Sequence, residues 1–223
     1  QWFSETVVRM PHGNVCYGPP DYAPDVNSLP ALENGYVTFG CCNNLAKIND
    51  RVMSLWADIL KAIPDSRLSL RTNTLDDEAT AQRVHDQFEG LGITPERVAL
   101  AGEAPHEAFM AHYHEIDMAL DPFPYSGGLT TCEALWMGVP VISMLGETFA
   151  GRHSASHLRN VGLDDWVAET AGEYLALAEK HGRDLEELAE LRASLRERMA
   201  TSPLCDGGRY TRDLEAVYRQ MWR

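Results

Sequence analysis

Apolar residues along the chain alternate between short β-rich runs and longer segments with helical spacing. The expected strands cover residues 37–42, 68–71, 98–102, 116–121 and 141–144. Apolar residues at three- and four-residue intervals fill the segments between them, and predict helices near 50–63, 76–92, 106–115 and 129–137. Strands that alternate with helices favour βαβ units. The sequence therefore predicts an α/β fold with a Rossmann-like parallel sheet and flanking helices.

The two ends of the chain depart from this pattern. Residues 1–34 are rich in Pro, Gly, Asp and Asn, cannot hold a long helix, and are expected to form an extended connector. Residues 35–223 would form the domain, with a mainly helical tail after 151. In the last predicted helix, 209–222, an apolar stripe indicates core packing in preference to a partner interface. The stripe consists of Tyr210, Leu214, Val217, Tyr218 and Met221.

Charge and composition exclude several classes of protein. The formal net charge is −14, and we see no basic patch of the kind that nucleic-acid binders use, so no nucleic-acid partner is expected. No apolar run approaches the roughly 18 residues of a membrane span. The chain begins Gln1-Trp2 without a Met or an apolar leader, so we expect a piece of a longer protein without a secretory signal.

The five cysteines form an odd set without metal-ligand spacing, so we expect no metal site and reduced thiols in the cytoplasm. Cys41 and Cys42 are adjacent in an expected strand, and their side chains should therefore point to opposite faces.

Ligands of a parallel sheet gather beyond the carboxyl ends of its strands. Three loops there contain candidate chemistry: residues 43–48, 102–106 and 121–136. In the third loop, Gly127 and Gly128 precede a helix, so bare backbone N–H groups and the positive end of the helix dipole can face a diphosphate.

Polar side chains close to these glycines extend the candidate site. Thr130 and Thr131 add hydroxyl donors, and Glu133 lies one turn further along, where its carboxylate could accept hydrogen bonds from a ribose diol. Lys47, from the first loop, could supply the cation that steadies a departing diphosphate.

The local pattern also has plainer explanations. Two glycines before a helix are often only a tight turn, and Thr is a common helix cap. The loop matches neither a Walker motif nor a dinucleotide fingerprint. His153 is expected to be structural, and Arg71 could either reach a ligand or form a surface ion pair.

Longer motifs resemble one family. Residues 121–128 read Asp-Pro-Phe-Pro-Tyr-Ser-Gly-Gly, residues 130–140 read Thr-Thr-Cys-Glu-Ala-Leu-Trp-Met-Gly-Val-Pro, and residues 43–48 read Asn-Asn-Leu-Ala-Lys-Ile. Together with 146–152, 210–215 and the connector, they resemble the O-linked N-acetylglucosamine transferase and SPINDLY-like family, bacterial type. The resemblance implies the C-terminal half of a GT-B glycosyltransferase, with residues 1–34 linking its two lobes.

The resemblance assigns roles to individual residues. Lys47 matches the family lysine on the diphosphate and is the expected catalytic residue, while Asn44 stands where a Gln commonly sits. Ala104 matches a residue whose backbone meets the uracil. Thr130 matches a threonine near the phosphates, and Glu133 an acidic residue on the ribose.

Several positions differ from the animal members. Gly128 and Leu129 replace a His and a Thr that contact the diphosphate, and His106 replaces a Lys. Phe109 and His112 replace a His and an Arg. These changes leave more of the donor contacts to backbone N–H groups, including those of Gly127 and Thr131.

The resemblance implies a cytoplasmic, inverting enzyme that moves N-acetylglucosamine from UDP-GlcNAc to Ser or Thr hydroxyls of proteins. It implies no metal or cofactor, and an acceptor protein held by an N-terminal lobe and repeats that this chain lacks, so the piece alone is expected to be inactive. Two alternatives stay open: a related transferase with another UDP- or GDP-hexose donor or an Asn acceptor, and an inactive nucleotide-binding module.

Overall fold

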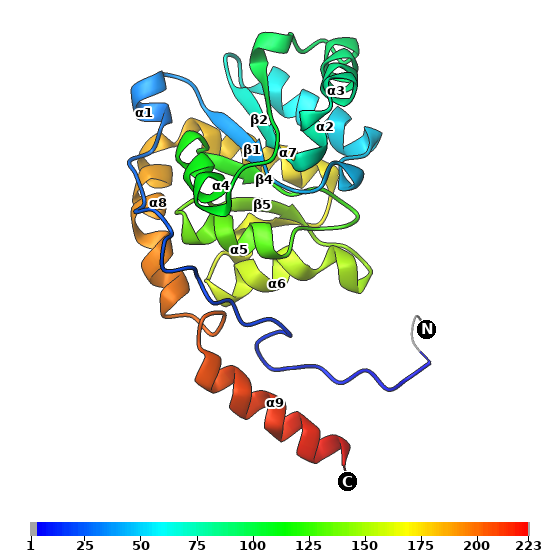
Figure 1. Ribbon diagram of the computed structural model, residues 1–223, viewed down its shortest axis with the longest axis vertical. Coiled ribbons are helices and arrows are strands. Elements are labelled where there is room, and N and C mark those ends of the chain that lie inside the picture. The colour runs from blue at the N-terminus through cyan, green and yellow to red at the C-terminus, as the bar shows by residue number, and fades with distance from the viewer. Residues whose placement is uncertain (1–3, 223) are drawn as a thin grey trace.

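Six parallel strands form the centre of the molecule in a computed structural model that describes residues 4–222 (Figure 1). Their order across the sheet is β3-β2-β1-β4-β5-β6. The strands are β1 (Thr38–Cys41), β2 (Arg67–Arg71), β3 (Val98–Ala101), β4 (Met118–Leu120), β5 (Val141–Met144) and β6 (Val167–Ala168). The five strands predicted from the sequence are confirmed. The sixth was not predicted, because two residues are too short to show a periodic pattern.

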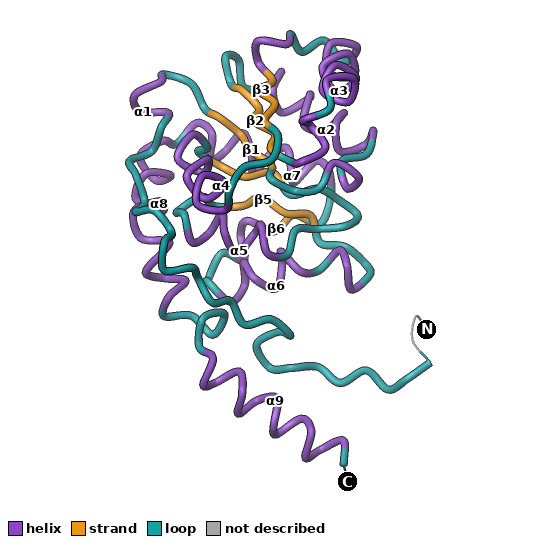
Figure 2. Tube along the Cα trace, viewed as in Figure 1, coloured by secondary structure: helices purple, strands orange, loops and turns teal. Residues whose placement is uncertain are grey.

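Helices connect the strands and cover both faces of the sheet (Figure 2). They are α1 (Ala31–Asn34), α2 (Asp50–Ala62), α3 (Glu78–Gly90), α4 (His106–His112), α5 (Leu129–Trp136), α6 (His153–Asn160), α7 (Ala171–Arg183), α8 (Leu185–Ala200) and α9 (Gly207–Met221). No helix in the described part of the chain is long and apolar enough to cross a membrane.

Helix α2 shows why the sequence folds as it does. The Asn49 side chain accepts hydrogen bonds from the backbone N–H groups of Arg51 and Val52 and so caps the helix. Val52 and Trp56, four residues apart, lie on one face and are fully buried. Burial of that face holds α2 against the sheet and fixes the loop that precedes it.

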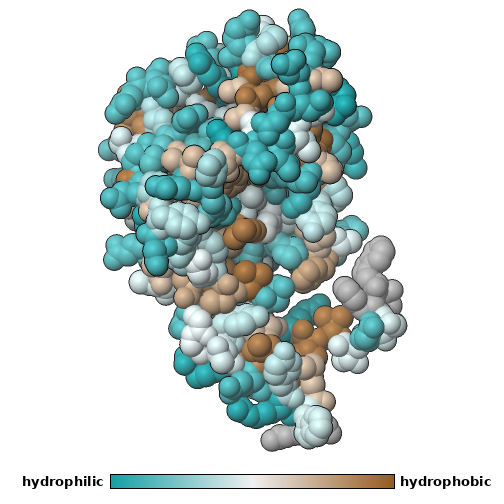
Figure 3. All heavy atoms as spheres, viewed as in Figure 1, coloured by the Kyte–Doolittle hydropathy of each residue, from teal (hydrophilic) through white to brown (hydrophobic). Residues whose placement is uncertain are grey.

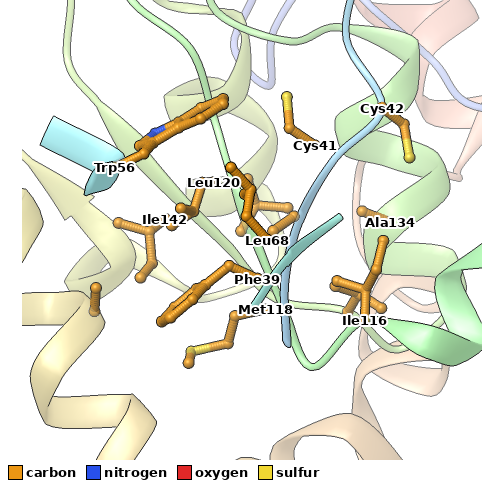
Figure 4. Close-up of a cluster of buried hydrophobic side chains, with 14 of the residues drawn as sticks. Phe39, Cys41, Cys42, Trp56, Leu68, Ile116, Met118, Leu120, Ala134 and Ile142 are labelled. Atoms are coloured by element: carbon orange, nitrogen blue, oxygen red, sulfur yellow. The ribbon is translucent and has the colours of Figure 1, made fainter. Parts of the chain in front are cut away.

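The core lies on both sides of β1 (Figure 4). Trp56 of α2 lies on one side of the strand and Ala134 of α5 on the other. Cys41 and Cys42 are both buried and point away from one another, as predicted from the alternation of a strand. The loops after β1 and β4 are thus held on a rigid scaffold.

Part of the predicted connector packs against the domain. Tyr17 is buried and its backbone N–H donates to the carbonyl oxygen of Leu204 at 2.8 Å. The carboxylate of Asp117 accepts from the backbone N–H groups of Ala31 and Thr38. The boundary at residue 34 stays a prediction.

The C-terminal helix corrects the sequence analysis. Helix α9 has no buried residue, and Tyr218 and Met221 of its apolar stripe are exposed, so the predicted core packing is wrong for this chain. Figure 1 shows α9 projecting from the sheet and its helices. Figure 3 shows apolar side chains gathered around α9 and the N-terminal segment on this face. The helical spacing of the apolar residues correctly predicted a helix, but this spacing does not show which surface, if any, packs against them.

Candidate functional site

The loops after β1, β3 and β4 meet at the carboxyl edge of the sheet, as parallel pairing requires. Hydrogen bonds link Lys47 of the first loop to Ser126 of the third, and His106 at the end of the second loop to Glu133 of the third. The sequence-predicted site residues therefore come from three loops that contact one another.

The glycine loop is tightly fitted on its inner side and open on its outer side. The Gly127 N–H donates to Asp121 Oδ1 at 2.6 Å. A Cβ atom on Gly127 would overlap the Thr131 hydroxyl and lie 2.9 Å from Asp121 Oδ1, so the position requires glycine. A Cβ atom on Gly128 would meet nothing within 4 Å. The backbone at Gly128 is thus accessible to a ligand.

The start of α5 has the properties of an anion site. Gly128 is its N-cap residue, no side chain caps it, and its first turn contains no acidic residue. Leu129, the first residue of the helix, is 63% exposed. Uncapped N–H groups and the helix dipole at an accessible turn favour a bound anion.

Lys47 is aimed at this loop. Its Nζ donates to the carbonyl oxygen of Ser126 at 2.9 Å and to Asn43 Oδ1 at 3.2 Å. The ammonium also lies 4.2 Å from the centre of the exposed Tyr125 ring, a cation–π contact. Partial burial lowers the pKa of Lys47, and the Asp121 carboxylate opposes that shift. A half-buried ammonium held this close to Gly127 is suited to stabilise charge on a phosphate.

The hydroxyl groups of Thr130 and Thr131 differ in burial and in their hydrogen-bond partners. Thr130 Oγ1 lies 3.3 Å from Asn43 Oδ1, to which it donates, and is only partly buried. The Thr131 hydroxyl is buried and lies 2.8 Å from Ser154 Oγ, which in turn donates to the Gly127 carbonyl oxygen. The Thr131 side chain therefore holds the glycine loop on its buried side. A ligand could contact Thr131 only through its backbone N–H.

Glu133 is buried, and its carboxylate is already hydrogen-bonded to His106. Only 3% of its side chain is exposed, and its Oε1 lies 2.8 Å from His106 Nε2. Burial raises the pKa of Glu133, and the hydrogen bond from His106 opposes that shift. His106 Nδ1 lies 2.9 Å from the hydroxyl of Tyr22, and its ring stacks on Phe109. His106 thus joins the connector to the carboxylate expected at the ribose.

Asn44 and Ala104 stand at the margins of the cluster. The exposed Asn44 caps the 3-10 turn Leu45–Lys47 by accepting from the Ala46 N–H, which orients the lysine. Ala104 is partly exposed in the loop after β3. That loop is anchored by Asp76, which accepts from the Glu103 N–H. The roles of Asn44 and Ala104 in donor binding stay predictions.

Other candidates from the sequence have structural partners. His153 packs edge-on against Phe149, with ring centres 4.5 Å apart. Arg71 donates to the Gly102 carbonyl oxygen at 3.2 Å and forms no ion pair within residues 4–222. His112 is buried against the Ser69 hydroxyl, and burial lowers its pKa to about 4.

Four residues that support the site were not singled out by the sequence analysis. They are Asn43, Asp121, Ser126 and Ser154, which hold Lys47, the Gly127 N–H and Thr131 in place. One signal was present for Asp121, a carboxylate that directly follows an apolar strand and precedes a glycine loop.

Two further observations delimit the site. In the part of the chain that the structure describes, no three His, Cys, Asp or Glu side chains are grouped to hold a metal ion. A cavity of about 370 Å³ opens instead at the opposite edge of the sheet, between Tyr36, Arg67 and His114, and no predicted site residue lines it.

Comparison with known proteins identifies the family. The model of "Glycosyl transferase family 41" matches residues 27–214, which contain every predicted site residue. The chain belongs to this family. The probable UDP-N-acetylglucosamine–peptide N-acetylglucosaminyltransferase SPINDLY of Solanum lycopersicum is 44% identical over 221 residues, 98% of this chain and 24% of that protein. The UDP-N-acetylglucosamine–peptide N-acetylglucosaminyltransferase of Caenorhabditis elegans is 29% identical over 86% of this chain and 16% of its own length.

A solved structure agrees with this assignment. The O-GlcNAc transferase of Thermobaculum terrenum matches this family 41 chain with a TM-score of 0.89 and 41% identity, over 97% of this chain and 41% of its own. This match confirms the predicted Rossmann-like half of a GT-B glycosyltransferase. HepE from Anabaena in complex with UDP-glucose, at 15% identity and a TM-score of 0.58, shares the fold. The chain spans about a quarter of the length of the curated SPINDLY relatives it matches.

Proposed function

We propose that this chain is the donor-binding lobe of an inverting glycosyltransferase that moves N-acetylglucosamine from UDP-GlcNAc to Ser or Thr hydroxyls of proteins. The observation that carries the proposal is the convergence of Lys47 and the uncapped start of α5 on one accessible turn. The chain's similarity to proteins named as peptide N-acetylglucosaminyltransferases supports the donor and the acceptor class.

The proposed donor pose follows from the chemistry of each group. The diphosphate lies over Gly127 and Gly128 and receives hydrogen bonds from the first-turn N–H groups of α5, Leu129 to Thr131. Glu133 accepts from the ribose hydroxyls, and Ala104 and His106 border the base. Asn44 lies at the outer edge beside Lys47.

Lys47 is the proposed catalytic residue. As the bond between the sugar and UDP breaks, negative charge develops on the departing phosphate oxygen. A fixed ammonium and oriented N–H groups stabilise that charge without rearrangement, and one such contact contributes about 3–4 kcal/mol to the transition state. The proposed reaction uses these groups in place of a metal ion or cofactor.

The acceptor protein would be bound outside this chain. His153, the histidine near Lys47, packs on Phe149. We propose that a further lobe and repeats bind the acceptor and that this chain alone does not turn over substrate. The cytoplasm is the proposed location because all five cysteines are free.

Donor competition tests the proposal and its alternatives. Labelled UDP bound to this chain would be displaced by UDP-GlcNAc at lower concentration than by UDP-glucose or a GDP-hexose. Stronger displacement by a GDP-hexose would favour the related transferase with another donor. Failure of every nucleotide sugar to displace UDP would instead favour an inactive nucleotide-binding module.

A further inference from the structure

Asp121 lies buried directly beneath the glycine loop. Its side chain is 1% exposed and stands at the end of β4. Oδ1 accepts from the Gly127 N–H at 2.6 Å, and Oδ2 accepts from the Ser143 hydroxyl at 2.6 Å. The Tyr174 hydroxyl donates to the Asp121 backbone carbonyl at 3.0 Å. Both carboxylate oxygens are therefore fixed, one by the loop and one by the sheet.

Besides Ser143 of β5, four elements place titratable or hydroxyl groups around this carboxylate. Lys47 approaches from the turn after β1, Cys41 from β1, Tyr174 from α7 and Ser154 from α6. Lys47 is the one cation that acts on Asp121 among the described residues, and its Nζ bonds to Ser126 and Asn43. The carboxylate thus has hydrogen bonds but no direct ion pair in residues 4–222.

This environment makes the ionisation of Asp121 sensitive to the charge of a ligand bound over Gly127. Burial raises the pKa of Asp121 to about 6, and hydrogen bonds from Ser143 and Gly127 and the charge of Lys47 limit the rise. A diphosphate over Gly127 would add negative charge next to the carboxylate. It would also interact with the ammonium of Lys47 and so weaken the stabilisation that this charge gives to the carboxylate. Both effects disfavour the ionised form.

We propose that Asp121 positions the glycine loop and takes up one proton from solvent when a nucleoside diphosphate sugar binds above that loop. The inference rests on the proposed function and names a residue that acts through Gly127 without touching the donor. The proton goes to Oδ2, because the Ser143 hydroxyl can rotate from donor to acceptor. Oδ1 still accepts from Gly127, so the loop keeps its shape in both protonation states.

Nuclear magnetic resonance of the unaltered chain tests the proposal directly. The Gly127 amide shift, followed from pH 5 to pH 8.5, reports ionisation of the carboxylate that it donates to. UDP-GlcNAc is the probe, since its phosphate diesters do not titrate in this range. We expect a midpoint near pH 6 without ligand and at about pH 7 or above with saturating UDP-GlcNAc.

The possible results separate this inference from the proposed function. UDP-GlcNAc that shifts the amides of Gly128 and Leu129 but leaves the Gly127 midpoint unchanged would overturn proton uptake alone. UDP-GlcNAc that shifts no site amide would overturn the proposed function and the inference with it.

An isosteric variant gives a second test. In Asp121→Asn the amide oxygen still accepts from Gly127 and the NH₂ group donates to Ser143, but no charge remains. We expect the dissociation constant for UDP-GlcNAc to rise about fivefold or more from pH 6 to pH 8 in the unaltered chain, and less than about twofold in Asp121→Asn. Asp121→Ala, which removes the acceptor for Gly127, should weaken binding at both pH values. Full pH dependence in Asp121→Asn would overturn the proposal and place the titration on Lys47 or a histidine.

Discussion

The Nζ atom of Lys47 lies 2.9 Å from the carbonyl oxygen of Ser126, the residue immediately before Gly127 and Gly128. This contact joins the loop after β1 to the loop after β4, two neighbouring strands of the sheet. It brings a cation to an uncapped helix start, where N–H groups already favour an anion. The arrangement supports donor binding and leaving-group stabilisation by the same few groups.

Removal of the lysine should affect catalysis more than folding. In a transferase that contains this chain with its acceptor-binding part, we expect Lys47→Ala to lower kcat about 10²–10³-fold, as loss of one transition-state donor does. Lys61→Ala is the matched control, since Lys61 lies on the surface of α2 in an exposed pair with Asp58. Steady-state transfer assays measure both. A Lys47→Ala enzyme with unchanged kcat would remove Lys47 from the mechanism.

The two glycines of the loop should respond differently to the same substitution. Gly127→Ala forces a methyl group against Thr131 and Asp121, and we expect a loss of about 1–3 kcal/mol in unfolding free energy. Gly128→Ala has open space, so a change within about 0.5 kcal/mol is expected. Urea unfolding of both variants checks this. Equal losses would mean that the loop is not packed as described.

Helix α9 should contribute little to the stability of this chain. Met221→Lys places a charge on an exposed residue, and we expect a change within about 0.5 kcal/mol in unfolding free energy. Leu195→Ala in α8 removes a fully buried side chain and should cost about 2–5 kcal/mol. Thermal or urea unfolding compares the two. A large loss in Met221→Lys would restore the core packing predicted from the sequence.

Stability should fall in acid because of buried neutral histidines. Burial lowers the pKa of His157 from 6.5 to about 4, so between these values the unfolded chain binds a proton that the folded chain does not. His157 therefore contributes stability above pH 6.5 that is lost as the pH falls toward 4. The expected loss from His157 alone is about 2 kcal/mol between pH 7 and pH 5.

The variant His157→Gln should reduce that loss. His112 acts in the same direction and remains in the variant, whereas Asp121, with a raised pKa, acts in the opposite direction. Urea unfolding at pH 7 and pH 5 gives the comparison. An identical difference between the two pH values in both proteins would rule out His157 as a source.

The regular part of the fold could be predicted from the sequence, and the exceptions have physical causes. The strands and helices from β1 to β5 have strong apolar patterns. Strand β6 has two residues and depends on pairing with β5, which is a tertiary contact. The stripe on α9 has the right period, yet a period cannot identify the surface that covers it.

The site was predictable where it depends on backbone and motif. Gly127, Gly128 and Lys47 could be found because the glycine pair and the lysine both follow strands, and loops at the carboxyl ends of parallel strands lie at one edge of the sheet. The directions in which the side chains of Thr131 and Asp121 point could not be predicted from the sequence. Thr131 turns its hydroxyl inward to Ser154, and Asp121 supports Gly127 from below, because packing against α6 and β5 decides both.

Calorimetric titration of UDP into this chain shows whether these loops form a nucleotide site. We expect UDP to bind, and its binding to weaken in Lys47→Ala and in Glu133→Ala. Binding should be unchanged in Lys61→Ala and Glu186→Ala, which lie at exposed helix positions. Each of the two site variants should lose about tenfold or more in affinity. No binding of UDP at millimolar concentration by the folded chain, or equal affinity in all four variants, would contradict a nucleotide site on these loops.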